Sequence, residues 1–150
     1  MLVLRVAGNQ RLLIGFYAFV SLAALIATWS QNLAYTGAGM LSAFQLFVQE
    51  TRVNPASRSI TVDIAFFLLA ASAFMVIEAR RLGVRFVWLY ILFGFLIAIS
   101  VTFPLFMIAR ELRLAPAAKP DTPWSLTVSD VIGLVLVAAA VLALNWFVLG

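Results

Sequence analysis

The sequence predicts an all-α integral membrane protein, a bundle of four transmembrane helices with a short interfacial helix between the first and the second. Three observations support this prediction. Hydrophobic residues make up 65% of the chain, and its mean hydropathy is +1.10. Only 11% of the residues are charged, too few to cover the apolar surface of a soluble domain of 150 residues. The apolar residues also form four long runs, each bounded by charged or aromatic side chains.

The clearest element lies between Asn54 and Gly83. Asn54 is a good N-cap, Pro55 suits the first helical position, and Gly83 favours a left-handed C-terminal cap. A helix of roughly 28 residues would measure about 42 Å, longer than a hydrocarbon core of about 30 Å. We therefore expect a span over residues 57–80, with both ends of its helix among the lipid headgroups.

Two elements precede this helix. The first apolar run predicts a span over residues 12–29, because it is long and lacks the cleavage site of a signal peptide. Residues 39–49 are too few to cross a membrane, but their apolar side chains recur at helical spacing. They predict an interfacial helix or a shallow re-entrant turn, which either packs on the end of the bundle or covers a site as a lid.

Two further spans follow. A turn after Gly83 leads into a span over residues 85–109, which Pro104 should kink or loosen near its end. The proline-rich residues 114–123 predict a solvent-exposed linker, and residues 126–148 predict the fourth span. Four spans place both termini on one side of the membrane.

The basic residues set the expected orientation. Lys and Arg are divided five against five between the two sides of the predicted bundle. The arginines of the short turn and of the N-terminus form the tighter group, which favours cytoplasmic termini in a bacterial inner membrane: Arg5, Arg11, Arg80, Arg81 and Arg85.

The missing residue types exclude several classes of function. The chain contains no histidine and no cysteine, which excludes disulfides, thiolate or imidazole metal sites and a catalytic Cys or His. We therefore expect no metal and no cofactor. Arginines at helix ends are typical headgroup anchors, so we expect the lipid bilayer and other membrane subunits, or a second copy, as partners, and no nucleic acid.

Three carboxyl groups within or beside the spans are candidates for chemistry: Asp63, Asp130 and Glu78. Alternating span direction places one polar set on the same side as three aromatic residues: Gln31, Asn32, Asp63, Thr102, Glu111 and Asp130, with Trp29, Phe103 and Trp124. If these residues converge, they form an acidic pocket with aromatic walls, in which Trp29, Asn32, Thr102 and Phe103 are candidates for ligand binding. A carboxyl group buried there would stay protonated, as a general acid requires.

Structural roles explain the same carboxyl groups. Asp63 and Asp130 lie near the starts of their helices, where the helix dipole favours a negative charge. Glu78 precedes Arg81 by three residues, and Arg85 follows the turn, so an interfacial cluster of ion pairs accounts for it.

Several short motifs resemble a known family. They are Asn54-Pro55-Ala56, Asp63, Glu78-Ala79-Arg80-Arg81-Leu82-Gly83, Trp88-Leu89-Tyr90 and Phe103-Pro104-Leu105-Phe106. Over residues 12–114 the chain resembles small bacterial integral membrane proteins of unknown function. Proteins of this type are similar to the membrane-bound terpene cyclases of fungal meroterpenoid pathways, which protonate an isoprenoid epoxide with intramembrane carboxylic acids. The resemblance implies Asp63 or Glu78 as the proton donor and an isoprenoid as the ligand.

Two functions from different classes follow. The favoured one is a non-catalytic accessory or structural subunit of a membrane complex, or a homo-oligomer, because no catalytic motif is present. The alternative is an isoprenoid-type binding protein or cyclase that uses an intramembrane carboxylic acid. A proton-coupled transporter is a third hypothesis, which would need dimerisation to build a pathway. The position of Asp63, inside the bundle or outside it, separates the first two.

Overall fold

The computed structural model describes residues 8–114 together with Val128, Ile132 and Ala139, and all its regular elements in this part are helical. This confirms the all-α prediction for that part of the chain. The linker predicted at 114–123, the fourth span predicted at 126–148 and Asp130 lie outside the described residues, apart from Leu114 and the three single residues. The elements, in order, are α1 (Gly8–Asn32), η1 (Leu33–Ala38), α2 (Met40–Glu50), α3 (Pro55–Leu82), α4 (Val87–Leu96) and α5 (Ile99–Leu114).

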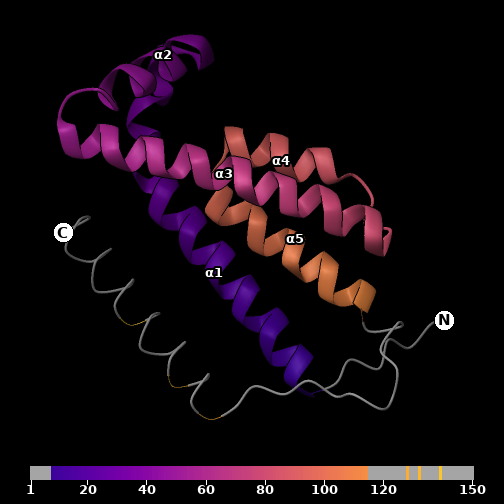
Figure 1. The fold of residues 1–150 in the computed structure, drawn as a ribbon. Coiled ribbons are helices and arrows are strands. Elements are labelled where there is room, and N and C mark those ends of the chain that lie inside the picture. The colour runs from indigo at the N-terminus through magenta and orange to yellow at the C-terminus, as the bar shows by residue number, and fades with distance from the viewer. Residues whose placement is uncertain (1–7, 115–127, 129–131, 133–138, 140–150) are drawn as a thin grey trace.

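Two helical stretches are long and apolar enough to cross a membrane, one from Gln10 to Gly37 and the other from Pro55 to Leu82. They cover the first two spans that the sequence predicts. Helix α2 forms where a short helix was expected, and its position relative to a membrane stays a prediction. Helix α2 and η1 together project from the end of α1 (Figure 1). The Tyr35 hydroxyl of η1 donates a hydrogen bond to the carboxylate of Glu50, the last residue of α2.

Both caps of α3 are confirmed. The Asn54 side chain accepts a hydrogen bond of 2.8 Å from the Ser57 backbone N–H, and Pro55 occupies the first turn. At the other end Gly83 takes a left-handed conformation with φ of 67°, and its N–H donates to the carbonyl of Ala79. These local signals fix α3 at 28 residues.

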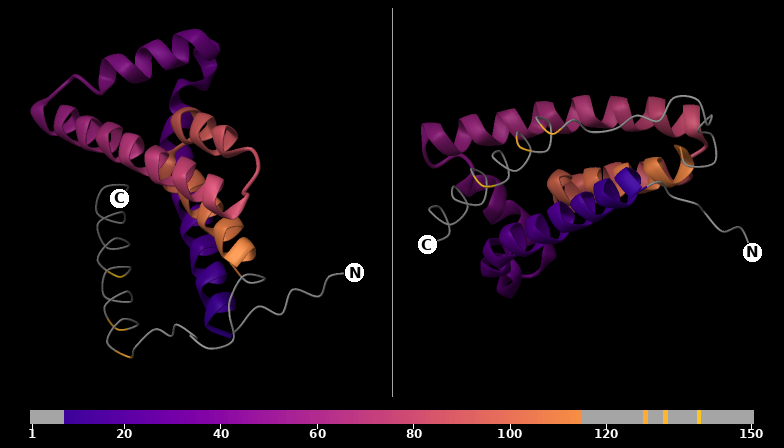
Figure 2. Two further views of the ribbon diagram at one scale, coloured as in Figure 1. Left: turned by 45° about the vertical axis from the view of Figure 1, so that its right-hand side comes forward. Right: turned by 90° about the horizontal axis from the view of Figure 1, so that it is seen from below.

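The structure replaces the single helix expected over residues 85–109 with two helices. The chain leaves α4 at Ile97 and begins α5 at Ile99, and α4 and α5 pack side by side as a helical hairpin (Figures 1 and 2). At 1.5 Å per residue the two helices measure about 15 Å and about 24 Å, so each is shorter than a hydrocarbon core of about 30 Å. Pro104, where a kink was expected, lies inside α5.

Close packing around Gly94 accounts for the hairpin. A Cβ atom on Gly94 would lie only 2.8 Å from Thr102 Oγ1, so the missing side chain lets α4 and α5 approach each other. Backbone hydrogen bonds hold the turn: the Ile97 N–H donates to the Phe93 carbonyl, and the Ala98 carbonyl accepts from the N–H of Thr102.

The core lies where α3 meets this hairpin. Met75 of α3 and Phe106 of α5 are fully buried, and the ring of Tyr90 of α4 stands edge-on to that of Phe106 at 5.7 Å. Helix α1 packs along α5 in the opposite direction, and the Ser21 hydroxyl donates 3.0 Å to the Val101 carbonyl. Only the C-terminal half of α3 has these neighbours, because its N-terminal half extends past α4 and α5 (Figures 1 and 2).

Candidate functional site

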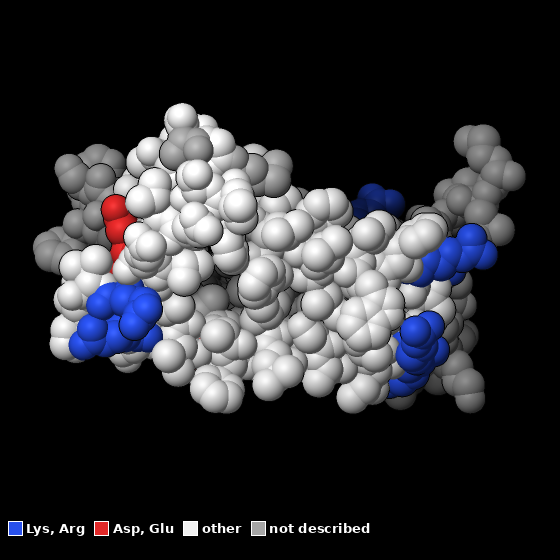
Figure 3. Space-filling model, turned by 90° about the horizontal axis from the view of Figure 1, so that it is seen from above, with Lys and Arg blue, Asp and Glu red and all other residues white. Residues whose placement is uncertain are grey.

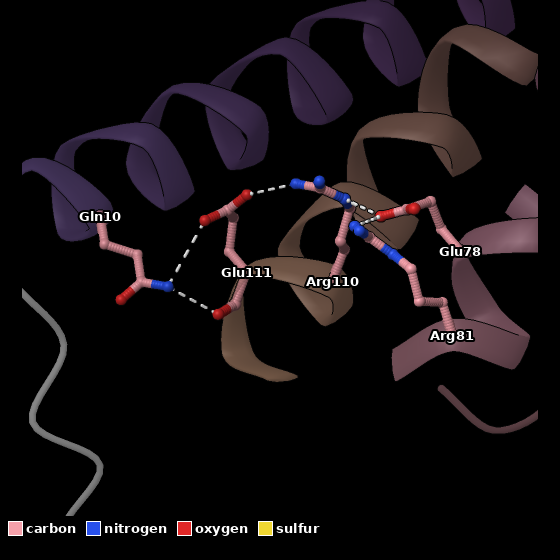
Figure 4. A network of polar contacts seen from close by, with 5 residues as sticks. All are labelled: Gln10, Glu78, Arg81, Arg110 and Glu111. Carbon is pink, nitrogen blue, oxygen red and sulfur yellow. Dashed lines mark hydrogen bonds and ion pairs between the residues drawn. The ribbon is translucent and has the colours of Figure 1, made fainter. Parts of the chain in front are cut away.

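Five polar side chains from three helices meet at one end of the molecule. We call them the polar network: Gln10 of α1, Glu78 and Arg81 of α3, and Arg110 and Glu111 of α5 (Figure 4). The hairpin brings them together. Because α5 returns toward the start of α4, its C-terminal end lies beside the C-terminal end of α3 and the N-terminal end of α1.

Hydrogen bonds and ion pairs run continuously through the polar network. Gln10 Nε2 donates to the backbone carbonyl of Glu111 at 2.6 Å and lies 3.4 Å from its Oε2. Arg110 bridges two carboxylates: its Nη1 lies 2.9 Å from Glu111 Oε1, and its Nε lies 2.7 Å from Glu78 Oε2. Arg81 Nη2 approaches the same Glu78 oxygen at 2.8 Å. The last pair is the i,i+3 pair that the sequence predicts.

The carboxylates of the polar network are the buried members. Glu111 is 2% exposed and Glu78 is 7% exposed, whereas the side chain of Arg81 is 59% exposed. Two carboxylates and two guanidinium groups balance, so the network as a whole carries no net charge. Glu78 Oε2 accepts from two guanidinium groups, an arrangement that joins helices and leaves Glu78 poorly placed to donate a proton to a ligand.

Asp63 lies away from this network, on the exposed N-terminal half of α3. Among the described residues, no side chain forms a hydrogen bond or an ion pair with its carboxylate. Its neighbours on the same face of α3 are also exposed, among them Ile60, Phe66, Phe67 and Ala70. Asp63 is therefore exposed and lies outside the core of the described bundle.

The candidate ligand-binding residues do not gather around Asp63. Trp29 and Asn32 are half-buried near the end of α1, whereas Thr102 is buried against Gly94. Phe103 packs its ring against α3, at 6.1 Å from Phe67 and Phe74. Trp29 Nε1 and Thr102 Oγ1 are buried without a hydrogen-bond partner in the described part of the chain.

The expected grouping of polar residues needs one correction. Glu111 was expected on the side of Asp63, but it lies in the polar network with Glu78, at the opposite end of α3. The physical reason is the hairpin, which returns α5 to the side that α4 left. Sequence reasoning also missed Gln10 and the bridging position of Arg110. The adjacent opposite charges of Arg110 and Glu111 were a signal, but their partners depend on the direction of α5.

A family model described as a protein of unknown function, DUF2834, matches residues 16–112. This range begins in α1, includes α2, α3 and α4, and ends in α5. No curated protein and no solved structure matches the chain. The similarity to terpene cyclases stays a prediction.

Proposed function

The chain belongs to the DUF2834 family, and we propose that it is an accessory subunit of a membrane complex, which binds a helix of another membrane protein through the N-terminal half of α3. The outward position of Asp63 is the observation that supports this proposal. An ionisable group within a membrane span is costly and needs a partner, and the described part of the chain supplies none for Asp63.

The surface supports a position in the membrane. Large apolar side chains are exposed along both long helices, among them Phe19 and Ile26 of α1 and Phe66 and Leu69 of α3. In water this exposure would cost about 25 cal/mol for each Å² of apolar area. Figure 3 shows that charged side chains lie toward the ends of one face, with an uncharged surface between them. Lipid chains are the solvent that fits this surface.

The hairpin of α4 and α5 fits a re-entrant element in this membrane. Its tip is apolar and exposed, with Phe95 at 64% and Leu96 at 56%. Such a tip is poorly suited to water, and backbone hydrogen bonds from Ile97 to Phe93 and from Thr102 to Ala98 pair some of its polar groups, which favours membrane depth. We place the tip among the lipid chains, so that the chain enters and leaves on the same side.

This placement changes the charge balance between the two sides. Six arginines lie at the end of the polar network: Arg11, Arg80, Arg81, Arg85, Arg110 and Arg113. Two lie at the other end, between α2 and the first turn of α3: Arg52 and Arg58. The positive-inside rule then puts the polar network and the N-terminus at the cytoplasmic face. If residues 126–148 cross as expected, the C-terminus lies outside, which revises the expectation of two cytoplasmic termini.

Asp63 lies about 12 Å along α3 from its first residue. When α3 is centred in the bilayer, this depth is roughly 6 Å inside the hydrocarbon boundary. A partner helix with an Arg, a Lys or a hydrogen-bond donor at this depth would complement the charge. Two copies pairing in parallel through this face would instead bring their Asp63 carboxylates together, so the charge favours a different protein as the partner.

The described residues give no comparable support to an isoprenoid cyclase. Asp63 is exposed, Glu78 is held by two guanidinium groups, and no hydrogen bond joins any two of the described candidate site residues. The cyclase therefore stays an expectation of the resemblance alone.

The test is native mass spectrometry of the protein purified gently from its own membranes. We expect a stoichiometric partner protein with the wild type and with Arg52→Gln, a matched control at the same end of the molecule but outside α3. Asp63→Asn should keep its helix content, because Asp63 bonds to nothing in the described bundle, and should bind the partner about 3- to 20-fold more weakly. A wild-type protein that purifies alone or as a homo-oligomer, or an Asp63→Asn variant that binds its partner as tightly as the wild type does, would refute the proposal.

A further inference from the structure

A cleft of about 410 Å³ lies at the turn between α3 and α4. Its lining combines arginines with aromatic side chains: Arg80, Arg85, Phe86 and Trp88. Buried Ala79 and Val87 also line it, so the cleft has an apolar floor. It is open to the surface at the end of the molecule where the polar network lies.

Two positive charges of this cleft are available to a ligand. Arg80 and Arg85 are exposed, and neither forms an ion pair with a described residue. Arg81 differs, because its guanidinium group is bound to Glu78. The cleft therefore presents two guanidinium groups and, among its lining residues, no acidic side chain. This chemistry selects an anion, and guanidinium groups bind phosphate well.

The aromatic residues of the cleft indicate what is attached to the anion. Phe86 is 74% exposed and Trp88 is 63% exposed, so both rings face out beside the arginines. Phe86 has a positive φ of 60°, which is uncommon for a bulky residue and costs roughly 1–3 kcal/mol. The fold thus tolerates strain where the chain presents this ring. Aromatic rings next to basic groups are typical of the headgroup layer, where acyl chains begin.

We propose that this cleft binds an anionic phospholipid of the cytoplasmic leaflet. Arg80 and Arg85 contact the phosphate group, while Phe86 and Trp88 lie against the first part of the acyl chains. Basic pockets beside membrane helices on the cytoplasmic side bind acidic headgroups by the same chemistry. This inference rests on the membrane placement proposed above and is independent of the partner at Asp63.

The experiment measures lipid retention by native mass spectrometry. Purified protein in detergent is mixed with equal amounts of phosphatidylglycerol and phosphatidylcholine. We expect the wild type to retain phosphatidylglycerol in preference. The double variant R80Q/R85Q should reduce that preference about 30-fold, and each single variant should reduce it about fivefold. The matched control R52Q/R58Q, which removes the two arginines at the opposite end, should leave the preference unchanged.

Two further arms identify the source of the phosphate. Phe86→Ala should weaken phosphatidylglycerol binding, and excess inorganic phosphate should not displace the lipid. Displacement by inorganic phosphate alone, with no effect of Phe86→Ala, would assign the cleft to free phosphate and overturn the lipid proposal. Equal retention of the two lipids by the wild type, or equal losses in R52Q/R58Q and R80Q/R85Q, would also overturn it.

The variants and the membrane placement are checked separately. Circular dichroism shows whether R80Q/R85Q folds, and the single variants give the answer if it does not. Extraction of cell membranes at alkaline pH shows whether the protein is embedded. An embedded protein without a lipid preference refutes only lipid binding in the cleft. A protein released by this extraction refutes the membrane placement as well.

Discussion

The substitution Gly94→Ala tests the packing that makes α4 and α5 a hairpin. An alanine Cβ would lie 2.8 Å from Thr102 Oγ1, closer than Cβ atoms are found to other atoms, and 3.2 Å from Ile99 Cδ1, a tight contact that requires a small shift. Overpacking of this kind lowers the free energy of unfolding by about 1–3 kcal/mol, and the higher helix propensity of alanine offsets about 1 kcal/mol of this loss. We therefore expect the free energy of unfolding to fall by about 1 kcal/mol.

A double-mutant cycle with Thr102→Ala isolates the collision. Thr102→Ala alone should change stability little, because the lost methyl group is offset by removal of a buried hydroxyl that has no partner among the described residues. The double variant removes the atom that the new Cβ meets, so it should be more stable than Gly94→Ala. We expect a coupling free energy of about 2 kcal/mol.

The assay is unfolding in detergent, followed by circular dichroism. Gly15→Ala is the matched control, because a Cβ at this helical position of α1 would meet no atom within 4 Å. It should gain up to about 1 kcal/mol from helix propensity. In one straight helix over residues 85–109, Gly94 and Thr102 would lie about 12 Å apart. A Gly94→Ala variant as stable as Gly15→Ala, with no coupling to Thr102→Ala, would refute the hairpin.

Two further predictions concern the polar network and the topology. Arg110→Gln leaves both buried carboxylates of the network without their bridging cation and should lower the free energy of unfolding by about 3 kcal/mol. Arg81→Gln removes a largely exposed partner and should lower it by at most about 1 kcal/mol. Equal losses for the two variants, measured by chemical denaturation, would contradict the bridging role of Arg110. In the cysteine-free background, a membrane-impermeant maleimide applied to intact cells should label Arg52→Cys, which lies outside in the proposed topology, and spare the cytoplasmic Arg85→Cys and Arg113→Cys. Labelling of Arg113→Cys together with Arg52→Cys would favour a straight third span.

The sequence predicts α3 well because its signals are local. Asn54, Pro55 and Gly83 act within one helical turn of the residues that they cap, and each does so in the structure. The i,i+3 pair of Glu78 and Arg81 is local in the same way. Such features need no knowledge of the rest of the fold.

The turn at Ile97 was not predictable by the same means. No glycine or proline marks it, and Pro104, the residue that suggested a kink, lies inside α5. The turn depends on contact between Gly94 and Thr102, which are eight positions apart and meet only when the chain folds back. The error in the expected position of Glu111 follows from this turn, since it decides that Glu111 lies beside Glu78, far from Asp63.

The spacing of the polar network along the chain has a consequence for synthesis. Gln10 and Glu78 leave the ribosome before Arg110, which follows Glu78 by 32 positions. At about 5–20 residues per second, Glu78 has only Arg81 as a described partner for about 2–6 s. During this time α1 and α3 are in the translocation machinery or the bilayer with an incomplete polar network, and the network is completed only when α5 has been made. Helix α1 can therefore form its polar contact with the rest of the network only after α5 has been made.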